Sequence, residues 1–177
     1  MSPDFDKDLA FTNIKAFSTL ETQAVSSILT LVQIDDQSDG ETLELQTILA
    51  KAAITSLYTQ ASLRIKLMVI AAFQPTKKVT ESLTNAKAIN SFLLNRGLDL
   101  TSLTKYAAFD EVRLLSNSVS HNGYVKTRDP LCEVYGWHVG QLPGHKIINN
   151  FSKYELASTE LCEEIKLSLI ATLSKLK

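Results

Sequence analysis

Residues 41–74 read ETLELQTILAKAAITSLYTQASLRIKLMVIAAFQ, and no glycine or proline interrupts them before Pro75. Ser38 and Glu41 have the spacing of a capping box, in which each side chain bonds to a backbone N–H at a helix start. This pattern predicts one helix of about 33 residues, roughly 50 Å long. Its second half is apolar on nearly all sides, which is typical of a central helix covered by other elements.

The rest of the chain predicts further helices around this one. A second capping box, Ser18 and Glu21, opens a predicted helix over 18–34, and a separate turn is predicted over 4–16. Apolar spacing and helix-ending glycines predict three more helices, at 80–96, 102–121 and 158–176.

Residues 124–149 differ in character, because glycines and Pro143 alternate there with β-branched and aromatic residues. Pro143-Gly144 suits the centre of a type II turn, so we predict a short β-hairpin at about 131–149. The sequence as a whole predicts an all-α, up-and-down bundle of four to five helices, with this small β-hairpin insertion before the last helix. We predict that residues 1–177 form a single domain.

Composition sets the broad class of the protein. The chain has 177 residues, 45% of them hydrophobic, so it can bury a sizeable core. The longest apolar run, Leu67–Phe73, is too short to cross a bilayer, and the N-terminus lacks an apolar export signal. Two cysteines, Cys132 and Cys162, have neither metal-ligand nor disulfide-scaffold spacing. We therefore expect a soluble, cytoplasmic protein with no membrane contact and no cofactor.

Charge is unevenly distributed although the net charge is only −1. Residues 1–50 carry two basic and nine acidic side chains, whereas residues 51–100 carry seven basic and two acidic ones. The basic side chains of the second segment could meet phosphates if they lie together. Alternatively, they pair with the acidic N-terminal helices inside the bundle, which is the more usual use of scattered charge.

The predicted helix over 102–121 has one apolar and one polar face. Its apolar stripe comprises Ala108, Val112, Leu115 and Val119. On the polar face Arg113, Asn117 and His121 follow at intervals of four residues, so their side chains can line one groove. Tyr106 and Asp110 lie on the same polar face.

These three residue types suit phosphodiester chemistry. A histidine can move a proton near neutral pH. An arginine can stabilise the extra negative charge that develops on phosphorus, and an asparagine can orient the imidazole or bind a phosphate oxygen. The alternative is that they form the ordinary polar face of a surface helix. Residues 116–122 are poor helix formers, however, and such local exceptions often mark a functional site.

The segment EVRLLSNSVSHNG, residues 111–123, resembles the signature helix of HEPN domains, which are helical nucleotide-binding domains. The resemblance implies a helical bundle with no cofactor that dimerises, so that two signature helices build one composite site. It also implies a metal-independent endoribonuclease of a toxin–antitoxin or phage-defence type. Within the signature, Asn117 matches the polar residue and His121 the histidine, while Glu111 and Arg113 resemble the Glu and Arg that often precede it.

The chain departs from the family pattern at Ser116, where the family places its catalytic arginine. Arg113 would therefore have to supply the cation, which makes Arg113, Asn117 and His121 the predicted catalytic residues. The alternative is a catalytically inactive interaction or regulatory module. Predicted RNA-binding residues are Arg64, Lys66, Tyr106 and Asp110, and no metal site is predicted. The expected partners are RNA, a second copy of the chain, and a cognate antitoxin or regulatory protein.

The predicted hairpin region contains two other candidate constellations. His138, His145 and Cys132 could bind a metal, but a fourth ligand is missing and the spacing fits no zinc pattern. Tyr135 and Trp137 could stack on bases, although large aromatic side chains more often serve burial, so we expect them to pack against the bundle.

Overall fold

The computed structural model describes residues 5–17, 40–121, 130–138, 140 and 144–175. The chain divides into two compact units. Unit 1 comprises Met1–Leu20, Gln60–Tyr106 and Thr159–Lys177, and unit 2 comprises Glu21–Thr59 and Ala107–Ser158. Each unit is described by itself below, and the single domain over 1–177 stays a prediction.

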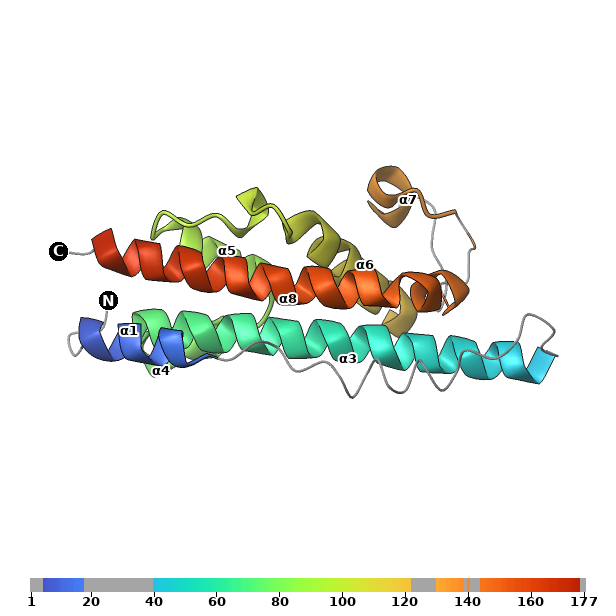
Figure 1. Cartoon of the computed structure of the whole chain (residues 1–177), viewed down its shortest axis with the longest axis horizontal. Helices are drawn as coiled ribbons and strands as arrows, with labels where there is room; N and C mark the ends of the chain where they lie inside the picture. The colour runs from blue at the N-terminus through green and yellow to red at the C-terminus, as the bar shows by residue number, and fades with distance from the viewer. Residues whose placement is uncertain (1–4, 18–39, 122–129, 139, 141–143, 176–177) are drawn as a thin grey trace. The chain divides into compact units, whose positions relative to one another are not determined.

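Almost all regular structure in the described residues is α-helical, as predicted (Figure 1). The elements are α1 (Lys7–Ala16), α3 (Gly40–Phe73), α4 (Lys77–Ser82), α5 (Ala86–Leu94), the 3-10 helix η1 (Leu100–Ser102), α6 (Tyr106–His121), α7 (Pro130–Tyr135) and α8 (Gly144–Lys175). No described helix has both the length and the apolar content that a membrane crossing requires. The helix predicted over 18–34 lies outside the described residues.

The β-hairpin predicted at about 131–149 is wrong, because the described part of this segment is helical and contains no strand. Gly136 adopts a positive φ of 67° directly after α7, where it ends a helix rather than forming a hairpin turn. At the other side, Gly144 begins α8, whose buried residues Ile147, Phe151 and Tyr154 recur at helical spacing. Trp137 and Ile147 are therefore buried in a helical unit, and α8 starts 14 residues before the predicted position 158.

The long predicted helix is confirmed as α3, which ends at Phe73 just before Pro75. Gln74 follows with a φ of +42°, an uncommon conformation for a residue other than glycine. Its side-chain amide donates to the Asp6 carbonyl at 2.8 Å and accepts from the Asp6 N–H at 3.3 Å. These two hydrogen bonds join the end of α3 to the start of α1 and offset the cost of the left-handed backbone.

The single helix predicted over 80–96 is wrong, because the chain forms α4 and α5 with a break between them. Asn85 causes the break, since its side chain accepts from the Ala88 N–H at 2.9 Å and so begins a new helix. The predicted glycine end is confirmed at Gly97, which has a φ of 79°. The N–H of Gly97 bonds to Leu94 O and that of Leu98 to Leu93 O, which is a Schellman motif.

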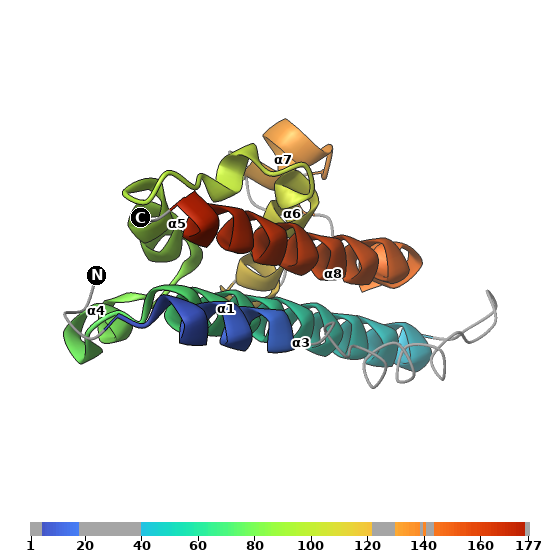
Figure 2. The same ribbon diagram turned by 60° about the vertical axis from the view of Figure 1, so that its left-hand side comes forward.

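Within unit 1, α1 lies alongside the C-terminal half of α3 in both views (Figures 1 and 2). At the far end of α1, the Lys166 ammonium of α8 donates to the Phe17 carbonyl at 2.6 Å. The Arg64 guanidinium lies 5.7 Å from the centre of the Phe17 ring. Since Asp6 meets Gln74 at the end of α3 and Phe17 meets Arg64 ten residues earlier, α1 and α3 run in opposite directions.

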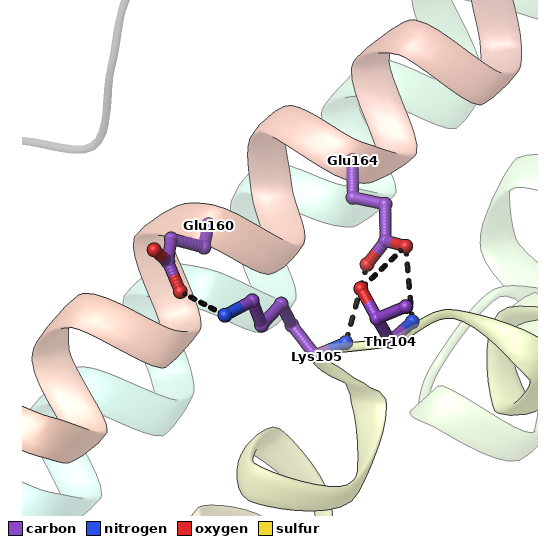
Figure 3. A network of polar contacts seen from close by, with 4 residues as sticks. All are labelled: Thr104, Lys105, Glu160 and Glu164. Atoms are coloured by element: carbon purple, nitrogen blue, oxygen red, sulfur yellow. Dashed lines mark hydrogen bonds and ion pairs between the residues drawn. The ribbon is translucent and has the colours of Figure 1, made fainter.

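A second polar network in unit 1 joins α8 to the segment that leads into α6 (Figure 3). The Glu164 carboxylate accepts from the Thr104 N–H and hydroxyl, both at 2.9 Å, and from the Lys105 N–H at 3.2 Å. The Lys105 ammonium also pairs with Glu160 at 2.7 Å. A carboxylate of α8 therefore satisfies the two backbone N–H groups just before α6 begins, as a capping side chain does.

Replacing Glu164 with glutamine is expected to cost about 1 kcal/mol at pH 7, the usual value of such a cap. Burial raises the pKa of Glu164, but the hydrogen bonds from Thr104 and Lys105 and the Lys105 charge lower it more, so the net pKa lies below its usual value. A depressed pKa means that the stabilisation is present above pH 4.5 and is lost as the pH falls through the pKa of the folded protein. Urea unfolding at pH 7 and pH 3 tests this.

The control is Glu163→Gln, because the Glu163 side chain is 40% exposed and its ion pair with Lys166 is long, at 3.9 Å. This neighbouring substitution should change the free energy of unfolding by less than about 0.5 kcal/mol at either pH. Equal losses at pH 7 for the two variants, or a Glu164→Gln loss that persists at pH 3, would contradict the capping role.

Candidate functional site

The candidate site lies on α6, whose residues from Ala107 onward belong to unit 2. Val112 and Leu115 are fully buried, which confirms the centre of the predicted apolar stripe. The stripe is wider than predicted, because Phe109 is only 2% exposed and its ring lies 5.8 Å from that of Tyr58. Burial of this side fixes which residues of α6 remain accessible.

Arg113, the predicted catalytic cation, is held by a carboxylate one turn earlier on the same helix. Its Nε donates to Asp110 Oδ1 at 2.7 Å, and the two side chains expose 29% and 21% of their surface. Partial burial makes this pair less screened than an exposed one. The carboxylate therefore fixes the orientation of the guanidinium and also balances much of its charge.

Tyr135 of α7 extends this pair into a three-residue cluster. Its hydroxyl donates to the Ala107 carbonyl at 2.8 Å and lies 3.4 Å from Asp110 Oδ2. Burial, followed by the nearby charge of Asp110, raises the pKa of Tyr135 to about 12. Tyr135 therefore stays protonated at physiological pH and remains a hydrogen-bond donor beside the Asp110–Arg113 pair.

Glu111 points to the opposite side and is built into the core of unit 2. It is only 7% exposed, and its Oε1 accepts from the Trp137 indole N–H and from the Tyr154 hydroxyl, each at 3.0 Å. Burial, followed by the charge of Glu111 and this hydrogen bond, raises the pKa of Tyr154. Lys146 lies over the Trp137 ring at 4.2 Å from its centre. The carboxylate thus joins α6, the segment after α7, and α8.

The remaining positions compared with the HEPN signature are Ser116, Asn117 and His121, and the first two differ in how far their side chains are exposed. Ser116, at the place of the family's arginine, is 4% exposed, so this position is part of the packing. Asn117 is exposed. His121 is the last residue of α6, and its side chain lies outside the described part of the chain. The helix is uninterrupted from Arg113 to His121, so the predicted spacing along one helix is confirmed.

The predicted RNA-binding residues are divided between the two units. Asp110 pairs with Arg113 in unit 2, whereas Arg64, Lys66 and Tyr106 belong to unit 1. Arg64 is half-buried beside Phe17, and its Nη2 is buried with no hydrogen-bond partner among the described residues. A guanidinium nitrogen that solvent does not reach is poorly placed for an RNA phosphate.

The described residues near α7 that the sequence offered for metal binding or base stacking have different surroundings. Trp137 is 2% exposed, which confirms that it serves packing. His138 is exposed and Cys132 is half-buried, while the His145 side chain lies outside the described residues. In the described ranges no three or more His, Cys, Asp or Glu side chains gather closely enough to hold a metal ion.

The sequence did not predict two partners of the acidic residues of α6, Tyr135 beside Asp110 and Tyr154 beside Glu111. Tyr135 was assigned to a hairpin, and Tyr154 was not singled out at all. One signal could have found the second, because Glu111 falls on the buried side of the helical wheel beside Val112 and Leu115. A buried carboxylate needs donors, and the aromatic N–H and O–H groups downstream are the obvious supply.

No protein-family model matches the chain, no curated protein matches it, and no solved structure matches it.

Proposed function

We propose that this protein is a HEPN-like, metal-independent endoribonuclease that acts through the polar face of α6. The observation that carries the proposal is the Asp110–Arg113 contact at 2.7 Å, which holds a guanidinium on that face. Asn117 is exposed one turn further along the same helix, and α6 ends at His121 after one more turn. The three groups that phosphodiester cleavage needs therefore follow one another on one regular helix.

In the proposed reaction, the ribose 2′-hydroxyl attacks the adjacent phosphorus. His121 takes the 2′ proton or supplies one to the departing 5′ oxygen, because an imidazole can do either near neutral pH. Arg113 stabilises the added charge on the phosphoryl oxygens, and Asn117 positions the scissile phosphate. The products are a 2′,3′-cyclic phosphate and a free 5′-hydroxyl. A second α6 from another copy of the chain would supply the histidine that acts in the complementary role.

A second candidate function is a non-catalytic HEPN-like module that binds a partner or regulates one. Two observations favour it. Ser116 is buried where the family has its arginine, and the Asp110 carboxylate already balances the charge of Arg113. A neutralised guanidinium stabilises a phosphorane less well than an unpaired one. This module would keep α6 for its packing, without cleavage.

Replacing His121 with alanine is expected to lower RNA cleavage at least about 100-fold, the usual minimum for loss of a general acid or base. The assay contains EDTA and follows a labelled single-stranded RNA by gel, with mass spectrometry for the 2′,3′-cyclic phosphate. A matched oligonucleotide with a 2′-deoxy sugar at the scissile position should not be cleaved. Cleavage that continues in His121→Ala would overturn the proposed role, and the absence of any cleavage by the wild type would support the second candidate.

A further inference from the structure

Charge separates between the two units far more than the net charge of the chain suggests. Unit 1 contains twelve basic and eight acidic side chains, whereas unit 2 contains six basic and eleven acidic ones. The candidate catalytic helix thus lies mostly in an acidic unit, while the positive charge that attracts nucleic acid lies in the other.

Within unit 1, the basic side chains divide into those with a partner and those without one. Lys105 pairs with Glu160 at 2.7 Å, and Lys166 bonds to the Phe17 carbonyl at 2.6 Å. Lys77, Lys78 and Lys87 are exposed, and among the described residues none of them makes an ion pair.

The positions of these lysines argue against a role in helix stability. Lys77 and Lys78 are in the first turn of α4 and Lys87 is in the first turn of α5, and neither turn contains an acidic residue. The helix dipole opposes a cation at this end, where an anionic side chain would be favourable. In the free protein the three lysines therefore lower the stability of α4 and α5 slightly. A bound polyanion would offset this loss.

Other features of the same segment fit a nucleic-acid backbone. Lys77 and Lys87 lie within about 25 Å, from the helical rise of α4 and the reach of the short connection that follows. The segment also has exposed hydroxyl side chains, which contact phosphates in many complexes: Thr76, Thr84 and Ser91. Phe92 is half-buried and covered by Arg96 at 3.5 Å from its ring centre, so no exposed aromatic ring is offered to bases.

We propose that the lysines of α4 and α5 bind the phosphate backbone of RNA without sequence preference. The choice of RNA among polyanions rests on the proposed function. The surface itself rests only on unpaired charge, exposure and hydrogen-bonding side chains.

The test compares two triple variants with the same loss of charge. One is Lys77→Gln, Lys78→Gln and Lys87→Gln. The control replaces three exposed lysines elsewhere in the chain, Lys15, Lys153 and Lys175, with glutamine. Binding of a fluorescent single-stranded RNA to wild type and variants is measured by anisotropy at several salt concentrations, with circular dichroism confirming that each variant is folded.

The first variant is expected to lower the slope of log K against log salt by about 2, since each phosphate contact on a single strand contributes about 0.7. Affinity at 0.1 M salt should fall roughly 10- to 100-fold by the same relation, while the control falls much less. Equal losses in the two variants would overturn the proposal. So would wild-type binding to phosphatidylserine vesicles with none to RNA, which would indicate a membrane surface.

The outcome is separable from that of the nuclease proposal. Lysine-dependent RNA binding without any cleavage would keep this inference and remove the ribonuclease. Cleavage by a wild type whose RNA affinity does not depend on the three lysines would keep the ribonuclease and remove this inference.

Discussion

Replacing Glu111 with leucine is expected to destabilise the protein by about 3 kcal/mol. The substitution removes the acceptor of two buried donors, the Trp137 indole N–H and the Tyr154 hydroxyl, each 3.0 Å from Oε1. Those two residues are 2% and 1% exposed, so water cannot replace the carboxylate without disrupting the packing. A buried donor left without an acceptor costs about 1–3 kcal/mol.

Urea unfolding measures this loss directly, and Trp137, the only tryptophan of the chain, reports it by fluorescence. Glu133→Leu is the matched control, because Glu133 is exposed on α7 and should change the free energy of unfolding by no more than about 0.5 kcal/mol. Glu111→Gln should lie between the two, since its amide oxygen can still accept both hydrogen bonds but carries no charge to strengthen them. Similar unfolding midpoints for Glu111→Leu and Glu133→Leu would show that the hydrogen bonds of Glu111 to Trp137 and Tyr154 do not stabilise unit 2.

Local signals along the chain predicted the helices that carry strong patterns. The stretch before Pro75 has no competing element, so α3 was predicted within two residues at each end. Gly97 was predicted to follow a helix end because only a positive φ completes a Schellman motif at low cost, and it does so. These features depend on a few adjacent residues, which sequence reasoning can judge.

The wrong predictions, the single helix over 80–96 and the hairpin at about 131–149, arose where a side-chain cap or burial decided the structure against the local pattern. Asn85 lies inside a regular apolar repeat, and its side-chain cap still breaks the helix predicted over 80–96. Ile147 and Trp137 have strand-forming side chains, but both are buried in a helical unit, and burial decided their structure. β-propensity measures how a side chain packs on its neighbours, and the neighbours here are helices.

The candidate site was predicted in part. The polar face of α6 follows from helical geometry alone, and Arg113 and Asn117 lie on it as expected. The partner of Arg113 is Asp110, which the sequence analysis had placed on the same face but assigned to RNA binding. Tyr135 comes from α7, 25 residues after Asp110 in the chain, and no local pattern links the two.

Replacing Arg113 with methionine is expected to lower the rate of RNA cleavage about 1,000-fold, because the developing phosphoryl charge loses its only proposed cation. The side chain is 29% exposed and its ion pair is local to α6, so methionine can cover the same surface and the fold should persist. Circular dichroism and Trp137 fluorescence would confirm that it does. Arg113→Lys should recover little activity, because a point charge cannot replace a planar guanidinium held through its Nε.

Asp110→Asn separates orientation from charge at the same contact. Asparagine can still accept a hydrogen bond from Arg113 Nε, which lies 2.7 Å from Asp110 Oδ1, but it no longer balances the guanidinium charge. If Arg113 is the catalytic cation, we expect a lower KM for RNA and a kcat that does not fall, because one negative charge is removed beside the phosphate while the Nε hydrogen bond is kept. A wild type that cleaves RNA and an Arg113→Met variant that cleaves it equally fast would assign Arg113 and Asp110 to the structure of α6 rather than to catalysis.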